Sequence, residues 1–534
     1  MLRPTNSFLV MTCVLCHLVA LNVPAETLNL TEATIADINA AFDSGALSSE
    51  KLIALSLARI EAYDDNGPAI NAVLLLNQNA LETARELDRE RSLQGPRSPL
   101  HGIPVVLKDN LDTGDMATTA GSFMLKGSVP PDDAFIVGKL REAGAIVLAK
   151  LNMSEFASGD AMSSLGGPIY NPHDPTHTPS GSSGGTGAAI AAGYAMMGIG
   201  TDTGGSVRGP SAANGIVGLK PTHGLLSRDG IIPLALSFDT AGPMARNVYD
   251  VAVSLGVMTG IDESDDATNK SAGHFETDYT QYLDADALKG ARIGIARDFM
   301  ESDQEVDWIV EASLQSMRDA GAEIVEVELP DWLMKSRGQF YRAIRYREFR
   351  AQIQDYLATL ESGYPKTLED LIKTSMTLTS RREDGVIPNP GRWKLMMDEV
   401  ESGELTDHEY LAVRDHALPL IRGIVGGIIE AENLDAIVYP TSPVRPEKVD
   451  PDPAPSDGPG SGGSPVILAN LTGFPDLIVP AGFTGRGLPV SVSFLGPAFS
   501  EPRLLALGYA FEQLTKARRL PQQTPQLPGE SFMY

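Results

Sequence analysis

The sequence predicts an α/β fold in which helices cover a largely buried sheet. Short apolar runs alternate with longer segments of helical periodicity, first between residues 101 and 150 and again between 285 and 445. This alternation is typical of layered α/β proteins. The chain of 534 residues is long enough for more than one domain, yet no long disordered linker divides it.

The first 25 residues have the pattern of a secretory signal peptide. The amino terminus carries positive charge, residues 7–21 are mostly apolar, and residues 23–25 place small side chains at the cleavage positions. A membrane anchor is the alternative, but the apolar run is short and is interrupted by Thr12 and His17. We therefore expect a secreted or periplasmic protein that keeps no membrane anchor after cleavage.

Both cysteines of the chain, Cys13 and Cys16, lie in this leader, so the mature chain has no disulfide and no catalytic thiol. The formal net charge is −27, which disfavours binding to nucleic acid backbones. We expect no nucleic-acid partner. A neutral or cationic substrate is easier to accommodate than a polyanion, although the acidic residues could also serve only to solvate the surface.

The region 26–93 has mainly helical patterns. A helix start is predicted at Thr31 and a second one at Ser48, because both resemble capping residues. Residues 52–63 have helical periodicity, and residues 80–93 form a charged helix that we expect to be exposed.

From residue 101 onward the sequence predicts alternating strands and helices. Two short apolar runs, IPVVLK and AIVLAK, predict strands on either side of a helix at 132–143, and small residues at 188–200 suit a helix followed by a strand. Farther along, strands are expected at 291–296, 322–329 and 434–439, and helices at 305–320, 335–360 and 406–431. The segment 445–465 is rich in proline and glycine, which predicts a surface loop or a lid over the active site.

Two motifs rich in glycine and serine, GSSGGTG at 181–187 and TGGS at 203–206, flank an apolar segment. Ser182 and Ser206 belong to these motifs, and Lys108 precedes them. Glycine allows backbone N–H groups to approach one point closely. Taken alone, however, the motifs could be two flexible loops, and an isolated lysine is usually on the surface. The spacing of a phosphate-binding loop is absent.

Together with their surroundings, these motifs resemble the amidase signature family of serine hydrolases. The similarity covers most of the mature chain and is weakest between residues 260 and 465. Within the family, SRDGIIP and DTAGPMAR look closest to secreted bacterial peptide amidases. The motifs that carry the resemblance are LHGIPVVLKDN, GSSGG, GTDTGGSVR, GIVGLKPTHGLLSRDGIIP, DTAGPMARNVYD and NLTGFPDLIVPAGF.

The resemblance implies a single domain over residues 26–534, with a mixed sheet flanked by helices on both faces. Its implied parts are N-terminal helices at 26–100, a catalytic core at 101–260, a variable substrate-binding region at 261–465 and a C-terminal part of the core at 466–534.

The resemblance also implies a Ser-Ser-Lys triad. Ser206 would be the nucleophile, Ser182 the bridging serine that follows a cis peptide bond after Gly181, and Lys108 the base. Lysine can accept a proton at neutral pH only if burial lowers its pKa from about 10.4, and the apolar run before Lys108 is consistent with such burial.

By the same resemblance, backbone N–H groups of the 203–206 loop form the oxyanion hole. Asp202 is expected to order this loop, and Arg208 to be structural. The oxyanion-hole residues would be Thr203, Gly204, Gly205 and Ser206.

Other nucleophiles and metal sites are less well supported. Ser183 is adjacent to Ser182 and fits a G-x-S-x-G pattern, but that motif must follow a strand, and here a proline-rich segment precedes it. His173 and His177 have helical spacing, but intervening prolines exclude a continuous helix. His101 is expected to be a structural hydrogen-bond donor. We predict no metal and no cofactor.

The sequence thus predicts an exported enzyme that hydrolyses a carboxamide through an acyl-serine and releases ammonia or an amine. A C-terminal peptide amide is the favoured substrate, on the subfamily resemblance. The alternatives are an amidotransferase A-type subunit, whose partners are cytoplasmic, and a non-catalytic exported binding protein on the same scaffold.

Overall fold

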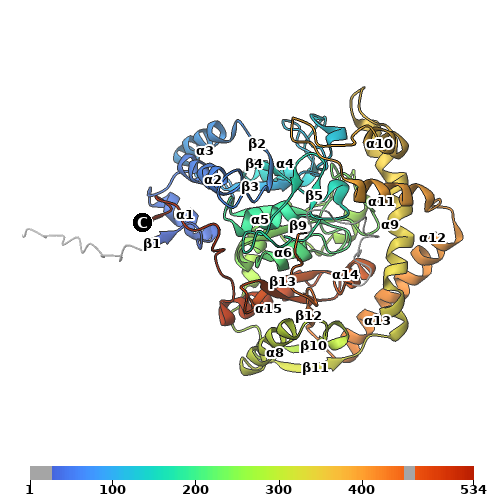
Figure 1. Ribbon diagram of the computed structural model, residues 1–534. Coiled ribbons are helices and arrows are strands. Elements are labelled where there is room, and N and C mark those ends of the chain that lie inside the picture. The colour runs from blue at the N-terminus through green and yellow to red at the C-terminus, as the bar shows by residue number, and fades with distance from the viewer. Residues whose placement is uncertain (1–26, 450–463, 534) are drawn as a thin grey trace, which may run out of the picture.

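The computed structural model describes residues 27–449 and 464–533 (Figure 1). The predicted leader at 1–25, with both cysteines, lies outside the described residues, as does most of the segment 445–465. Within the described ranges, no helix is long and apolar enough to cross a membrane.

Strands and helices alternate along much of the chain, as the apolar pattern predicts. The strands are β1 (Thr27–Asn29), β2 (Val73–Leu76), β3 (Pro104–Lys108), β4 (Ile146–Leu151), β5 (Met162–Ser163), β6 (Gly167–Pro168), β7 (Met197–Asp202), β8 (Val217–Lys220), β9 (Thr240–Ala245), β10 (Arg292–Ala296), β11 (Glu323–Val327), β12 (Ala436–Pro440), β13 (Asp476–Phe483), β14 (Pro489–Leu495) and β15 (Ser531–Met533). The α-helices are α1 (Ile35–Asp43), α2 (Ser49–Tyr63), α3 (Ala80–Gln94), α4 (Phe135–Glu142), α5 (Gly184–Ala191), α6 (Arg208–Ala213), α7 (Val248–Met258), α8 (Gln304–Asp319), α9 (Asp331–Thr359), α10 (Leu368–Ser375), α11 (Pro390–Glu401), α12 (His408–Ala412), α13 (Leu418–Ala431), α14 (Ile467–Thr472) and α15 (Glu501–Thr515).

Eleven of these strands form one mixed sheet in the order β11-β10-β12-β14-β13-β8-β9-β7-β3-β4-β2. Strand β3 is parallel to β4 and β7, and β10 is parallel to β11 and β12. The other neighbouring pairs are antiparallel. The sheet therefore confirms the predicted α/β fold class and its mixed strand directions.

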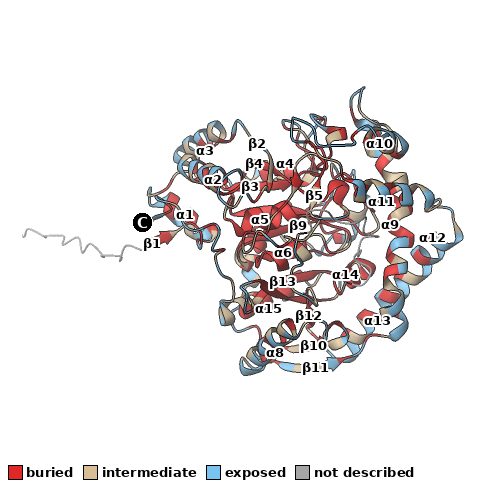
Figure 2. Ribbon diagram, viewed as in Figure 1, coloured by how far each residue is buried: buried red, intermediate tan, exposed pale blue. Residues whose placement is uncertain are grey.

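Helices cover both faces of the sheet. In β3, Val105 and Leu107 belong to one hydrophobic core and Val106 to another, because successive side chains of a strand point to opposite faces. Residues of α1, α4, α7, α8 and α15 fill the first core. The other face is covered by α2, α3 and α5 toward one edge and by α9, α13 and α14 toward the other. Figure 2 shows the buried residues concentrated on the sheet and on the helix sides that face it.

The N-terminal region differs from its prediction in three places, the first being strand β1, which pairs with β15. The first helix begins after Thr34, whose side chain accepts a hydrogen bond from the Asp37 N–H, so the predicted start at Thr31 is wrong. Thr31 instead donates its hydroxyl to Asn29, directly after β1. Strand β2 was also missed, because it is short and pairs with β4 at the edge of the sheet. The start at Ser48 is confirmed, since Ser48 caps α2.

The region 261–465 contains the long helix α9, which runs along one side of the molecule (Figure 1). The helix predicted at 406–431 is confirmed, and it contains a π-helical turn at Val413–Ala417 that joins α12 to α13. Helices α10 and α11 lie between α9 and α12 in the sequence and were not predicted.

Candidate active site

Ser182 and Ser206 line one pocket of about 290 Å³. Ser182 lies in the loop that leads into α5, and Ser206 lies in the turn between β7 and α6. The two loops are joined directly, since the Ser183 N–H donates to the Ser206 carbonyl at 3.2 Å. The fold thus brings together two serines that are 24 residues apart in sequence.

Lys108 lies directly behind Ser182. It is the last residue of β3, is fully buried, and its Nζ lies 2.7 Å from Ser182 Oγ. Its other contacts belong to Thr201 on the neighbouring strand β7, with the hydroxyl at 2.7 Å and the carbonyl at 3.3 Å. Asn110 donates to the same Thr201 hydroxyl at 3.0 Å. No carboxylate of the described residues forms an ion pair with Lys108.

Burial lowers the pKa of Lys108 to about 7, although the nearby carboxylates of Asp202 and Asp239 oppose this change. A buried charge without a paired counter-ion is costly, so the neutral amine becomes accessible near neutral pH. A neutral amine can donate two protons to Thr201 and direct its lone pair at the Ser182 hydroxyl. The arrangement therefore suits a lysine that accepts a proton from Ser182.

The two adjacent serines are held differently. The peptide bond between Gly181 and Ser182 is cis, and the Ser182 carbonyl accepts from the Ser154 N–H at 3.0 Å. The Ser183 side chain is fully buried and engages the backbone N–H and carbonyl of Thr201, each at 3.3 Å. The hydroxyl of Ser183 is therefore engaged in hydrogen bonds with the backbone of β7, whereas Ser182 lies between Lys108 and the pocket.

The loop that carries Ser206 is fixed by Asp202. Its carboxylate accepts from the backbone N–H groups of Gly205 at 2.9 Å and Val207 at 3.0 Å. Gly205 has a φ of 115°, and a Cβ there would lie 2.4 Å from Val466, so glycine is required. This confirms that Asp202 orders the loop.

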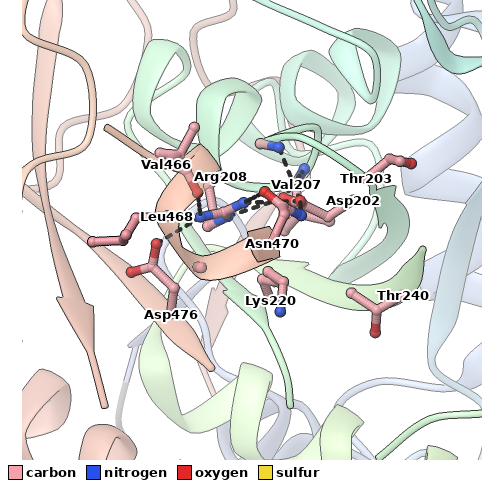
Figure 3. Close-up of polar contacts among 12 residues, drawn as sticks. Asp202, Thr203, Val207, Arg208, Lys220, Thr240, Val466, Leu468, Asn470 and Asp476 are labelled. Carbon is pink, nitrogen blue, oxygen red and sulfur yellow. Dashed lines mark hydrogen bonds and ion pairs between the residues drawn. The ribbon is translucent and has the colours of Figure 1, made fainter. Parts of the chain in front are cut away.

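Arg208 links this loop to the far half of the sheet (Figure 3). Its guanidinium is fully buried and pairs with Asp202 at 2.9 Å and with Asp476 at 2.8 Å. It also donates to Asn470 at 2.6 Å and to the Val466 carbonyl. The two carboxylates keep the pKa of Arg208 above its usual value, and Arg208 in turn keeps that of Asp202 well below its usual range. Arg208 is structural, as predicted.

The structure leaves fewer N–H donors for the oxyanion hole than the sequence predicts. The Gly205 N–H already donates to Asp202, so it is not free to bind a substrate oxygen. Within the described part of the chain, the N–H groups of Thr203, Gly204 and Ser206 have no hydrogen-bond partner. Gly205 is therefore removed from the predicted oxyanion hole, which keeps the N–H groups of Thr203, Gly204 and Ser206.

Comparison with known proteins identifies the family of the chain. The Amidase family model matches residues 51–505 of the chain. The chain belongs to the amidase family. As an amidase it acts on amide C–N bonds.

Several relatives resemble this amidase over nearly the whole chain. The A-type subunit of the glutamyl-tRNA(Gln) amidotransferase from Halorhodospira halophila is 38% identical over 499 residues, which cover 91% of this chain and 97% of the relative. The structure of a native peptide amidase from Stenotrophomonas maltophilia has 39% identity and a TM-score of 0.83, and covers 92% of this chain and 99% of that chain. The structure of the corresponding amidotransferase subunit from Thermotoga maritima has 28% identity and a TM-score of 0.71. The match covers 93% of this chain and 99% of that chain.

Some polar residues around the amidase site were not found from the sequence. Thr203 donates its hydroxyl to Asp239 at 2.5 Å, and the second Asp239 oxygen accepts from the N–H groups of Leu234 and Ala235. Thr201 was also missed as the partner of Lys108. No local motif marks Thr201 or Asp239, because each is one of many Thr and Asp residues in the chain. Only the pairing of strands brings them to the site.

His101, His173 and His177 do not line the pocket of the two serines. His173 contacts the Asn214 carbonyl, and His177 pairs with Asp174, so the two do not form a joint site. His101 is buried between the Arg97 N–H and the Leu87 carbonyl, which confirms its structural role. No group of three or more potential metal-ligating side chains occurs in residues 27–449 and 464–533.

Proposed function

We propose that this amidase hydrolyses a carboxamide through an acyl-enzyme on Ser206. One observation carries the proposal: Lys108 is fully buried, has a pKa of about 7, and contacts Ser182, which shares a pocket with Ser206. A serine hydroxyl is a weak nucleophile until a base accepts its proton. Lys108 and Ser182 provide a path for that proton.

In the proposed reaction, Ser206 Oγ attacks the carbonyl carbon as its proton passes to Ser182, whose own proton passes to Lys108. The new C–O bond creates an oxyanion, which the N–H groups of Thr203, Gly204 and Ser206 would stabilise. One such donor contributes about 2.7–4 kcal/mol. Return of the proton to the nitrogen breaks the C–N bond and releases ammonia or an amine. Water then attacks the acyl group on Ser206 by the same proton path and regenerates the serine.

C-terminal peptide amides are the substrate class that we propose. The similarity to the Stenotrophomonas maltophilia peptide amidase supports this choice, because both its identity and its TM-score exceed those of the Thermotoga maritima amidotransferase subunit. The predicted leader supports action outside the cytoplasm, in the periplasm or the medium.

Similarity to amidotransferase subunits of the A type supports a second candidate function. In that case the chain would work with partner subunits and would pass ammonia to them. Copurification of the full chain from its source, followed by mass spectrometry, separates the two candidates. A stable complex with other subunits would favour the amidotransferase, and an isolated active chain would favour the peptide amidase.

The direct test is ammonia release from a panel of peptide amides, aryl amides and fatty amides. We expect the peptide amides to give the highest kcat/KM, and Ser206→Ala to abolish the activity. If the purified protein releases no ammonia from any amide and a fluorophosphonate probe does not label it, the proposal fails and a non-catalytic binding protein becomes the better account.

A further inference from the structure

Arg345 of α9 is a buried cation in the wall of the catalytic pocket. Its side chain is only 2% exposed, yet within the described residues its Nη2 has no hydrogen-bond partner. Its Nη1 contacts a single carboxylate, Glu399 of α11. Buried guanidinium groups are normally saturated with acceptors, because an unsatisfied charged donor is costly. Arg345 therefore lines the pocket and retains hydrogen-bonding capacity, although both of its Nη atoms are buried in the structure.

The carboxylate beside Arg345 is shared with a second cation. Glu399 also accepts from Arg392 Nη1, at 3.1 and 3.0 Å, and all three side chains are buried. Two guanidinium groups thus compete for one carboxylate. The nearby Glu155 accepts hydrogen bonds from Ser164 and Asn389, and burial raises its pKa.

Neighbouring aromatic rings hold the Arg345 guanidinium in place. Its Cζ lies 4.9 Å from the centre of the Tyr346 ring and 5.7 Å from that of Phe349. Tyr346 also lines the pocket. A guanidinium fixed in this way loses little conformational freedom when it binds a planar anion.

We propose that Arg345 binds a carboxylate in the acyl part of the substrate, so that amides of acidic peptides are preferred over their neutral equivalents. The inference deepens the proposed function and rests on it, because it assumes that the acyl group occupies this pocket. A carboxylate matches the positive charge of the guanidinium and can accept two parallel hydrogen bonds from it. It would supply the acceptor that Arg345 lacks because Glu399 is shared with Arg392.

This preference runs against the charge of the whole chain. A formal charge of −27 favours neutral or cationic substrates at long range, but exposed charges are screened over about 10 Å in ordinary buffers. Among the described residues that line the pocket, Arg342 and Arg345 outnumber a single acidic residue, Asp160. The local cations therefore decide which acyl group binds after the substrate has arrived.

Pairs of peptide amides test the proposal. Each pair carries either glutamate or its uncharged γ-methyl ester, placed in turn at the last, second-last and third-last residue. At one of these positions we expect the wild type to have a kcat/KM for the glutamate substrate that exceeds that for its ester by about tenfold or more. In Arg345→Met this ratio should fall to about one, and Arg345→Lys should keep part of it.

Arg347→Met is the matched control, since it removes the same charge from the same helix. Arg347 pairs with Glu409 and does not line the pocket, so its variant should keep the wild-type ratio. The ratio compares two substrates on one protein sample, so partial loss of folded protein does not affect it. Equal rates for every pair in the wild type, or an unchanged ratio in Arg345→Met, would overturn the proposal.

Binding separates this proposal from the proposed function. Calorimetry with Ser206→Ala measures the affinity for each acid and ester without turnover. If no amide is hydrolysed but the acid still binds at least about tenfold more tightly than the ester, the assignment of Arg345 stands while the proposed reaction fails. Equal affinities within every pair would refute the role of Arg345 whatever the outcome for hydrolysis.

Discussion

Lys108 and Lys150 lie on neighbouring parallel strands, β3 and β4, and both are fully buried. Both contact hydroxyl and carbonyl oxygens, but within the described residues only Lys150 forms an ion pair with a carboxylate. Lys150 donates to the Leu111 carbonyl and the Thr118 hydroxyl, both at 2.7 Å, and lies 3.7 Å from the Asp109 carboxylate. Within the part of the chain that the structure describes, Lys108 contacts two hydroxyls and one carbonyl, and no carboxylate.

The comparison shows how one sheet can hold both a structural cation and a base. Burial lowers the pKa of both lysines, but the Asp109 carboxylate at 3.7 Å opposes this change at Lys150 and favours its ammonium form, whereas Lys108 contacts a serine hydroxyl that can donate a proton to it. Lys220 shows that a lowered pKa is not sufficient. Burial also lowers its pKa to about 7, but its partners are the carbonyls of Pro221 and Phe474, and no hydroxyl of the described residues is in a position to give it a proton.

Replacing each lysine by methionine is expected to give the largest contrast. Lys108→Met should lower kcat by about 10²–10⁴-fold at pH 7, because the base is removed. Its thermal stability should not fall, since burial disfavours the charge that is removed. Lys150→Met should instead destabilise the fold by about 3–5 kcal/mol, because Asp109 loses its buried counter-ion. Activity per folded molecule and denaturant unfolding measure the two effects, and equal loss of stability in both variants would contradict the comparison.

Ser182→Ala and Lys108→Met should not be additive. Both break one proton path, so the double variant should be little slower than the slower single variant. Single-turnover rates of the two single variants and the double variant on one peptide amide measure how strongly the two substitutions interact. Fully additive effects would mean that the two residues contribute separately and that no relay joins them.

The pH dependence distinguishes a lowered lysine pKa from an ordinary one. Only neutral Lys108 can accept a proton, so kcat/KM should rise as the pH increases through about 7 and then level off. A lysine of usual pKa would move this rise to about 10.4. Lys108→Met should lack the rise near 7 and recover some activity in alkali. Persistence of the rise near pH 7 in that variant would assign it to another group.

Thr201→Val is expected to have the smallest effect. It removes the hydroxyl that accepts from Lys108 at 2.7 Å but keeps the backbone carbonyl. We expect a loss of about tenfold in kcat, from weaker positioning of the amine, and a shift of the pH profile toward lower pH because the ammonium form loses an acceptor. A shift toward higher pH would contradict the assigned contact.

The sequence was informative where one short motif makes one local structure. The apolar run before Lys108 predicts its buried strand, and the glycines around Ser206 predict a tight loop. The sequence was uninformative where distant segments supply single side chains. Thr201, Asp239 and Arg345 become part of the site only through strand pairing or through packing of α9, and none has a local pattern that identifies it.

The oxyanion hole shows a second limit. Four consecutive N–H groups look equivalent in the sequence, but the Asp202 carboxylate occupies the one at Gly205. Which donors remain free depends on the side chain of Asp202, whose orientation is fixed in turn by Arg208. Such competition between a side chain and a ligand for one N–H group can be seen only in three dimensions.

Mass spectrometry of the acyl-enzyme tests the central claim most directly. A peptide amide is mixed with excess protein at pH 7, the reaction is quenched within one turnover, and the acylated residue is located. We expect the acyl group on Ser206 in the wild type and in folded Lys150→Met, and none within the same time in Lys108→Met. An acyl group on Ser182 or Ser183, or acylation of Lys108→Met at the wild-type rate, would contradict the assignment of Ser206 as nucleophile and Lys108 as its base.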